Sequence, residues 1–289
     1  MATDKKTAPR PAAAPLGGKR GRRAAANAFS AAVSLIVVGV SLFPLFWMLL
    51  SCFKTKREVA AGVFWPDSFS LDAFVQLADT PFFHSLLVTL AGALISVTLC
   101  IIINLCAAYA FARLEFFGKK LLWVLVLLPM FVPGMTILVP LFLVCSDLGI
   151  LDTMTVLIIP GVAQATHIFF MRQFFLNVPA SLEEAASVDG AGTFATLWYL
   201  FLPLAAGPSV IVGINAFMGY WNAYLWPVLV VERESLKQIM QVIYSFKPAH
   251  DPNWPLIMAA SAIAVAIPLA IYLVFHKQIV ESLKISGIK

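Results

Sequence analysis

The sequence predicts an all-α membrane protein that crosses the bilayer six times. The chain has 289 residues, of which 61% are apolar and only 12% are charged. Soluble globular proteins are about half apolar and about a quarter charged, so an ordinary soluble domain is excluded. The mean hydropathy of +0.89 points the same way, and the apolar residues are gathered in six long runs. These three observations favour a polytopic bundle of transmembrane helices.

Each apolar run is long enough to span a membrane. A spanning helix needs about 20 residues, because the hydrocarbon layer is about 30 Å thick and each residue rises about 1.5 Å. Among Asp, Glu, Lys and Arg, only Arg172 falls within the six runs, near the end of the fourth. Prolines interrupt several runs, which packed membrane helices tolerate. The predicted spans are residues 31–53, 85–112, 121–145, 153–175, 207–231 and 255–276.

The positive charge of the chain is concentrated before the first span. Residues 1–30 hold seven basic residues and one acidic residue without apolar periodicity, so we expect a disordered basic cytoplasmic tail, followed by a six-span domain over residues 31–289. The first apolar run is too long for the core of a cleaved signal peptide and is expected to remain as an anchor. The rest of the chain has a net charge close to zero, so no nucleic-acid partner is expected.

The distribution of basic residues between loops predicts the orientation. Six crossings place both termini on one side, and Lys and Arg number 14 on that side against six on the other. Cytoplasmic loops carry the excess of basic residues in membrane proteins. Both termini are therefore expected in the cytoplasm.

The residues disfavour two classes of membrane protein. An ion-coupled secondary transporter or a channel of six spans is the alternative function, but such proteins usually carry a membrane-embedded acid, base or filter. The six predicted spans contain no Asp or Glu. Catalysis within the chain is disfavoured because the four histidines are scattered, with no HExxH or Ser/His/Asp spacing. The four cysteines show no CxxC spacing, so no metal site or disulfide framework is expected.

The loop between the fourth and fifth spans, residues 176–206, carries the most informative pattern. Ser181 can cap a helix whose first turn holds Glu183 and Glu184, where the helix dipole favours acids. Gly190 suits a left-handed turn at the end of this helix. Thr193 can cap a second helix that runs to about residue 201 and ends before Pro203. Two short helices with exposed apolar residues need a partner on the membrane surface.

This loop resembles the EAA loop of permeases from ABC importers. The family pattern reads EAA, three residues, G, nine residues, then I-x-L-P, and the chain departs from it only by Leu200 in place of Ile. Other stretches, among them residues 108–113, 128–133, 149–153 and 220–227, resemble the maltose-type permease subunit of carbohydrate ABC importers, over roughly residues 30–289. The loop residues of interest are Glu184, Ala185, Ala186, Asp189, Gly190, Leu200, Leu202 and Pro203.

The resemblance implies a type I ABC importer permease bundle in the bacterial cytoplasmic (inner) membrane. It implies that the loop forms a coupling helix that docks on a cytoplasmic ATPase, with Glu184 pairing with a basic group there. The chain has no GxxxxGK[ST] sequence, so no cofactor is expected in it, and ATP and Mg²⁺ are expected on two partner ATP-binding subunits. A second homologous permease, an extracytoplasmic solute-binding protein and membrane lipid complete the expected partners.

The expected cargo is a sugar or sugar-like solute of the oligosaccharide, disaccharide or glycerol-phosphate class. Sugar sites combine stacking aromatics with hydrogen-bonding side chains, but the same residues also pack membrane helices together. The loop 232–254, with Lys237, Gln238, His250 and Trp254, resembles the external segment that reaches the binding protein, although a solvated loop is an equal alternative. The candidates for the translocation pathway are Asn215, Tyr220, Trp221, Asn222 and Tyr224.

Overall fold

The computed structural model describes residues 17–247 and 252–287, and these residues are α-helical without a strand. The predicted all-α fold is confirmed. The residues up to Leu50 and those from Ser51 onward form two compact units.

The first unit consists of helix α1 (Gly17–Ser51). It begins at Gly17, so residues 17–30 are helical where a disordered tail was predicted, and residues 1–16 lie outside the described residues. Alanine, arginine and lysine are strong helix formers, and they extend the apolar helix toward the N-terminus. The part from Asn27 to Ser51 is long and apolar enough to cross a membrane.

Helix α4 (Phe82–Arg113) is the centre of the second unit, where it contacts α7 (Met154–Val162), α8 (Ala165–Leu176) and α12 (Ala206–Trp221). Small residues allow this close packing. A Cβ added at Gly92 of α4 would lie 2.0 Å from the hydroxyl oxygen of the buried Tyr220 on α12. A larger residue at position 92 would therefore have to displace the buried Tyr220 ring.

Long helix α15 (Trp254–Gly287) packs against α12 and against α3 (Asp72–Ala78). Its segment from Trp254 to Gln278 is one of three unbroken helices that could cross a membrane, with α4 and part of α1. These three correspond to the first, second and sixth predicted spans.

The other three predicted spans are bent. The third consists of α5 (Lys119–Leu127), the 3-10 turn η1 (Leu128–Phe131) and α6 (Gly134–Asp147), with a bend of 111°. The fourth consists of α7 and α8 and bends by 43°. The described residues thus provide six spans if each bent pair crosses the membrane once.

The fifth predicted span, residues 207–231, is interrupted. Helix α12 ends at Trp221, and the short helix α13 (Leu225–Val230) follows after a break. A bend of 79° separates α12 from the helical segment Thr193–Leu204 that precedes it. The hydropathy pattern does not reveal this break, because Asn222 is the single amide among the apolar and aromatic residues around it.

Buried Asn104 explains how the fourth span can break inside a membrane. Its Nδ2 donates to the carbonyls of Cys100 at 2.6 Å and Val162 at 2.7 Å, and its Oδ1 accepts from the N–H of Gln164 at 3.0 Å. In lipid, backbone groups that leave a helix must find partners within the protein. One amide on α4 thus pairs a freed carbonyl and a freed N–H at the junction of α7 and α8.

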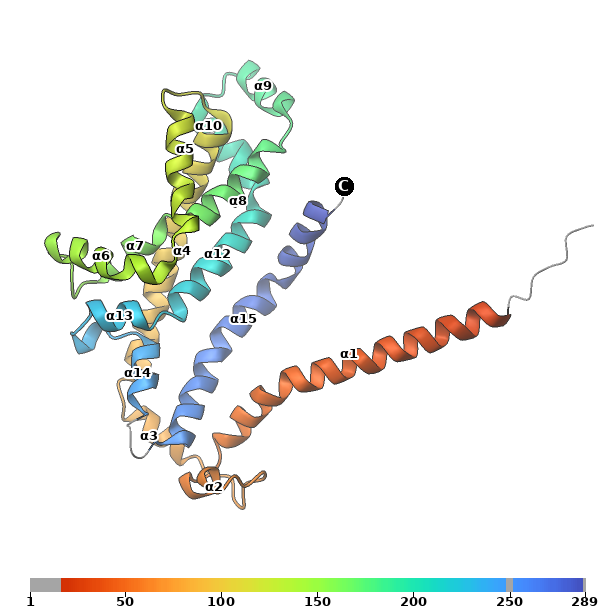
Figure 1. Ribbon diagram of the computed structural model, residues 1–289, viewed down its shortest axis with the longest axis vertical. Helices are drawn as coiled ribbons and strands as arrows, with labels where there is room; N and C mark the ends of the chain where they lie inside the picture. Colours follow the sequence, from red (N-terminus) through yellow and green to blue (C-terminus); the bar gives the residue numbers. More distant parts are fainter. Residues whose placement is uncertain (1–16, 248–251, 288–289) are drawn as a thin grey trace, which may run out of the picture. The chain divides into compact units, whose positions relative to one another are not determined.

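Figure 1 shows α9 (Ala180–Val188) and α10 (Thr193–Thr196) at one end of the second unit and α2 (Lys56–Ala60) and α3 at the other. The predicted external loop 232–254 is more ordered than expected, because it contains η3 (Glu234–Leu236) and α14 (Ile239–Ser245). Helix α14 buries Ile239, Val242 and Ile243. Gln238, expected to reach a partner, is 1% exposed, and His250 lies outside the described residues.

Candidate functional site

The predicted first helix of the patterned loop is α9 (Ala180–Val188). Its N-cap is Pro179, without a capping side chain, so the predicted cap at Ser181 is wrong. Proline fixes its own φ near the value that precedes a helix, which suffices to start one here. At the other end Gly190 has φ +80°, and its N–H donates to the carbonyl of Ser187 at 3.0 Å. The predicted left-handed turn at Gly190 is confirmed.

The second helix of the loop continues through Pro203 instead of ending there. It begins as α10 (Thr193–Thr196) after Gly192, and Thr193 makes no cap bond. A π-helical turn η2 (Leu197–Phe201) follows, and α11 (Leu202–Leu204) contains Pro203. Proline has no N–H to give to the preceding turn, and the wider π turn accommodates the missing bond.

Arg113, the last residue of α4, ties α9 to the rest of the bundle. One of its guanidinium nitrogens lies 3.6 Å from a carboxylate oxygen of Glu183, the residue before the EAA triplet. The other donates to the carbonyl of Phe175 at 2.6 Å and also to the carbonyl of Val178. Tyr109, one turn earlier on α4, donates its hydroxyl to Glu183 at 3.4 Å. We call Tyr109, Arg113 and Glu183 the latch.

Aromatic rings hold the latch in place. Phe201 of the π turn lies with its ring centre 5.0 Å from that of Tyr109 and 5.2 Å from that of Phe175. The guanidinium carbon of Arg113 is 5.3 Å from the centre of the Phe201 ring, a cation–π distance. Phe175 and Phe201 are fully buried, so the end of α8 and the second helix of the loop share one buried aromatic cluster beside the latch.

The two consecutive glutamates of α9 have different environments. The Glu183 side chain is 32% exposed and paired with Arg113, whereas Glu184 is exposed. Glu183 therefore holds α9 to the bundle, and Glu184 is available to another molecule. Sequence reasoning named Glu184 but missed the latch, although Arg113 ends a stretch that resembles the family and Glu183 was recognised as a first-turn acid.

Some of the remaining motif residues are exposed, and others pack against the bundle. Ala185, Asp189, Gly190 and Pro203 are exposed, and Ala186 is half-buried. Leu200 and Leu202 are half-buried and pack against the same hydrophobic cluster as Phe201. The loop also exposes large apolar side chains, namely Leu182 at 41%, Val188 at 87%, Phe194 at 69% and Tyr199 at 85%.

The pathway candidates do not form one cluster. Tyr220 and Trp221 are buried, and Trp221 stacks on Phe217 with ring centres 5.3 Å apart. Asn215 is exposed and donates to the carbonyl of Ile211 in its own helix at 2.9 Å. Asn222 is exposed at the end of α12.

Tyr224, the last pathway candidate, lines a hollow with both polar and apolar residues. Its ring stacks on Tyr244 of α14 with centres 4.1 Å apart. Both rings line a hollow of about 500 Å³ together with Glu232, Lys237 and Gln241. Tyr220 lines a different, mainly apolar hollow of about 380 Å³.

In the described part of the chain none of the four cysteines forms a disulfide. No group of three or more His, Cys, Asp or Glu side chains there could hold a metal ion.

Comparison with known proteins identifies the family. Residues 101–284 match the family described as "Binding-protein-dependent transport system inner membrane component". The chain belongs to this family. The resemblance to importer permeases, predicted from the EAA loop, is confirmed, and the permease is an inner-membrane component.

Known relatives of the permease cover most of its length. The sulfoquinovosyl glycerol transport system permease protein of Agrobacterium fabrum is 31% identical over 267 residues, covering 90% of this chain and 93% of that protein. The trehalose transport system permease protein of Mycobacterium tuberculosis is 30% identical over 264 residues, covering 90% and 96%. The lactose transport system permease protein of Rhizobium radiobacter is 28% identical over 252 residues, covering 84% and 90%.

A solved structure has the same fold. A chain of a bacterial ABC transporter involved in the import of the acidic polysaccharide alginate superposes with a TM-score of 0.79. It is 22% identical, and the match covers 87% of this chain and 95% of that chain.

A second polar cluster of the permease joins the segment before α7 to the segment after α13. Asp152, with φ +56°, accepts hydrogen bonds on Oδ1 from the N–H groups of Glu232 at 3.1 Å and Arg233 at 2.9 Å. Its other oxygen lies 3.4 Å from Nε of Arg233, and its own N–H donates to the carbonyl of Val230 at 2.8 Å. The hydrogen bond from the N–H of Arg233 is the main cause that lowers the pKa of Asp152.

We expect Asp152→Asn to lower the melting temperature of the purified permease complex, and Asp152→Ala to lower it further. Asparagine keeps the acceptor oxygen and tolerates a positive φ, whereas alanine does neither. Because the folded-state pKa lies below the unfolded value, the advantage of aspartate over asparagine is full at neutral pH. This advantage begins to fall when the pH drops below the unfolded-state pKa of aspartate, about 3.9. It is lost once the pH has fallen through the lower pKa of the folded state.

Thermal unfolding at pH 7 and at acid pH checks this prediction. Asp147→Asn, at an exposed aspartate at the end of α6, is the matched control and should leave the melting temperature unchanged. If the difference in melting temperature between wild type and Asp152→Asn is as large at acid pH as at pH 7, the role of the charge is contradicted.

Proposed function

We propose that this permease moves a sugar or sugar-like solute inward across the cytoplasmic membrane, driven by ATP hydrolysis on separate subunits that grip α9. The observation that carries the proposal is the arrangement of α9, which is held to α4 and α8 by the latch while Glu184 remains exposed. A helix fixed on its inner side and free on its outer side can pass a force from a partner to the bundle.

The partner of α9 is proposed to be an ATP-binding subunit with a basic group facing Glu184. The small side chains of Ala185 and Ala186 let a partner approach the backbone of α9, and the exposed Val188 and Phe194 offer apolar contacts. ATP and Mg²⁺ belong to two such subunits, and the permease itself is not catalytic. A second homologous permease would provide the second coupling loop.

Transmission through the latch follows from its connections. Arg113 joins the end of α4, the end of α8 and α9, so a displacement of α9 acts on two long helices at once. Packed helices switch between discrete arrangements instead of deforming continuously. Opening toward the outside is therefore proposed to be a rigid-body movement that begins at α9.

The face with α9 is proposed to be cytoplasmic, together with both termini. The end with α2 and α3 then faces outward, toward a solute-binding protein, as the family description "binding-protein-dependent" suggests. A related structure of a bacterial alginate ABC transporter was solved in complex with a periplasmic protein that carries an alginate pentasaccharide. The absence of Asp and Glu from the predicted spans disfavours the alternative of ion coupling.

A sugar cargo is supported by relatives named for lactose, trehalose and sulfoquinovosyl glycerol transport. Within the chain, the hollow beside Tyr224 and Tyr244 has the aromatic faces and polar groups that sugars require. Asn215 and Asn222 are exposed and suit hydrogen bonding to a solute. Tyr220 and Trp221 are buried and act mainly in packing.

We expect Glu184→Lys to reduce uptake of a labelled disaccharide roughly tenfold or more, because it replaces attraction to a basic partner group by repulsion. The measurement uses the complete transporter in liposomes with its binding protein, ATP inside and labelled sugar outside. Asp147→Lys reverses an exposed charge outside the loop and should transport normally. Uptake by Glu184→Lys at the wild-type rate, with normal insertion, would contradict the role of α9.

A further inference from the structure

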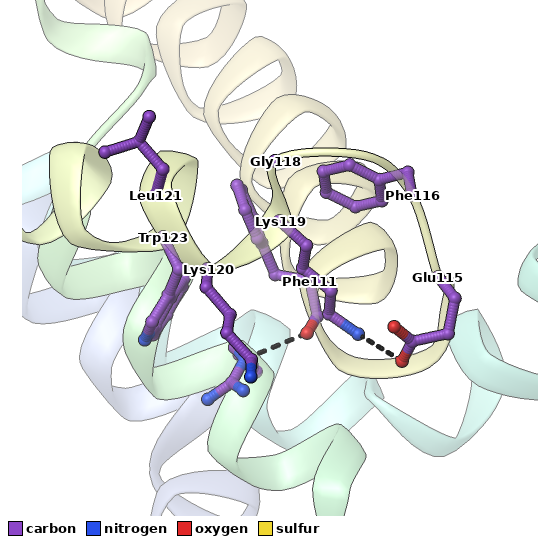
Figure 2. A pocket seen from close by; sticks show the side chains of 9 residues that line it. Phe111, Glu115, Phe116, Gly118, Lys119, Lys120, Leu121 and Trp123 are labelled. Carbon is purple, nitrogen blue, oxygen red and sulfur yellow. Dashed lines mark hydrogen bonds and ion pairs between the residues drawn. The ribbon is translucent and has the colours of Figure 1, made fainter.

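A basic hollow of about 510 Å³ lies beside the loop between α4 and α5 and is separate from the latch. Figure 2 shows Lys119 and Lys120 projecting into it from the first turn of α5, beneath Gly118 and Phe116. Arg172 of α8 and Trp123 of α5 also line it. The hollow is on the α9 side of the bundle, because the α4–α5 loop that lines it follows Arg113, which bonds to the carbonyl of Val178 just before α9.

The guanidinium group of Arg172 is held in a fixed position. Its Nε donates to the carbonyl of Phe111 at 3.0 Å, and its central carbon lies 4.3 Å from the centre of the Trp123 ring. Trp123 in turn packs against Phe111 with ring centres 5.2 Å apart. The hydrogen bond from Nε uses one edge of the guanidinium group, and the Trp123 ring covers one of its faces. The four other N–H groups of Arg172 can still donate to a ligand.

The charges around the hollow do not cancel. Glu115 is the acid that lines it, and this carboxylate is paired with Lys119 at 2.9 Å. Lys120 is exposed and has no carboxylate partner among the described residues. Lys120 and Arg172 therefore leave an excess of two positive charges facing one space. The N-terminal end of α5 adds the positive end of a helix dipole.

The hollow is located where a membrane span begins. Helix α5 starts the third span at Lys119, and its side chains beyond the hollow are apolar and exposed, with Val124 at 55% and Leu125 at 49%. Phe117 in the adjoining loop is fully exposed. Tryptophan and basic residues at such a position are typical of the headgroup region of a bilayer.

We propose that this hollow binds the phosphate headgroup of an anionic phospholipid from the leaflet on the α9 side. Lys120 and Arg172 contact the phosphate, Trp123 lies at the glycerol level, and the acyl chains follow the exposed apolar face of α5. Basic pockets between membrane helices are suited to such headgroups, because basic residues near an anionic surface are attracted to it. The inference depends on the membrane location of the family and is independent of the cargo and of the role of α9.

The test measures lipid binding to the intact transporter complex by native mass spectrometry. Phosphatidylglycerol should bind at least about tenfold more tightly than phosphatidylethanolamine, and Lys120→Glu should remove most of this preference. Lys277→Glu, at an exposed lysine near the end of α15, is the matched control and should leave the preference intact. Lys120 is exposed, so its substitution is not expected to disturb folding.

A second measurement locates the lipid. Phosphatidylglycerol with brominated acyl chains should quench the fluorescence of Trp123, observed as the difference between wild type and Trp123→Phe, and Lys120→Glu should abolish this quenching. Equal binding of both phospholipids, or an equal effect of Lys277→Glu, would overturn the proposal. Displacement of the lipid by millimolar inorganic phosphate would instead identify a site for free phosphate and would also overturn it. None of these readouts depends on sugar uptake.

Discussion

Replacing Arg113 with alanine is expected to detach α9 from the bundle and to reduce sugar uptake while the complex still hydrolyses ATP. The substitution removes the ion pair with Glu183 and the hydrogen bonds to the carbonyls of Phe175 and Val178. The Arg113 side chain is only 12% exposed, so water replaces these contacts poorly. The expected cost is on the order of 3 kcal/mol, because charged hydrogen bonds and a largely buried pair are lost together.

A cost of this size changes an equilibrium about 100-fold, so α9 would be unlatched in much of the population. Uptake in liposomes should fall at least about tenfold, and ATP hydrolysis should become uncoupled from transport. Arg113→Lys keeps the charge but has a single nitrogen, which cannot pair with Glu183 and bond the two carbonyls as the two guanidinium nitrogens do, so an intermediate loss is expected.

A double-mutant cycle separates the latch from general destabilisation. Glu183→Gln alone should be milder, and the effects of Arg113→Ala and Glu183→Gln should be less than additive, because both remove the same ion pair. Normal uptake by Arg113→Ala, or strictly additive effects, would contradict the latch.

The second large effect is expected at Gly190, where Gly190→Pro should abolish uptake and Gly190→Asn should preserve most of it. The residue has φ +80°, and nothing lies within 4 Å of where its Cβ would be. Proline fixes φ near −65° and cannot adopt this conformation, and it also removes the N–H that bonds to the carbonyl of Ser187. Asparagine tolerates the left-handed region at a cost of about 1 kcal/mol.

The pair of substitutions separates backbone conformation from side-chain volume, because both add atoms to a position with free space around it. Uptake and the amount of assembled complex are measured together for both. Equal uptake by the proline and asparagine variants would show that the turn after α9 has no role in coupling.

The spans and the loop could be predicted from the sequence because their signals are local. Long apolar runs predict helices, and the EAA spacing places Glu184 and Gly190 at the start and the end of a short helix region. The bends could not be predicted, since they depend on partners distant in sequence. Asn104 pairs with Val162 and Gln164, which are about 60 positions away.

The latch was missed for the same reason. Arg113 and Glu183 are far apart in the sequence, and each alone has an ordinary interpretation, a basic residue at the end of a span and an acid in a first helical turn. Only packing of α4 against α8 brings them together. The prediction that the helix ends before Pro203 was wrong, because a π turn before the proline lets the helix continue. This turn contains the buried Phe201, whose packing is not visible in the sequence.

Among the pathway candidates, composition could not separate packing residues from exposed ones. Trp221 and Tyr224 are both aromatic and three positions apart, yet Trp221 is buried and Tyr224 lines an open hollow. Because α12 ends between these two residues, their side chains lie in different environments.

Site-directed cross-linking tests most directly whether α9 is the surface that an ATP-binding subunit grips. Cysteine is introduced at the exposed Ala185, or at the exposed Asp147 as a control, in a variant whose exposed Cys106 is replaced by serine. The complex in membranes is treated with a short thiol-to-amine cross-linker. A covalent adduct with the ATP-binding subunit is expected from Ala185→Cys and not from Asp147→Cys. No adduct from Ala185→Cys in an assembled complex, or the same adduct from Asp147→Cys, would contradict the proposed coupling.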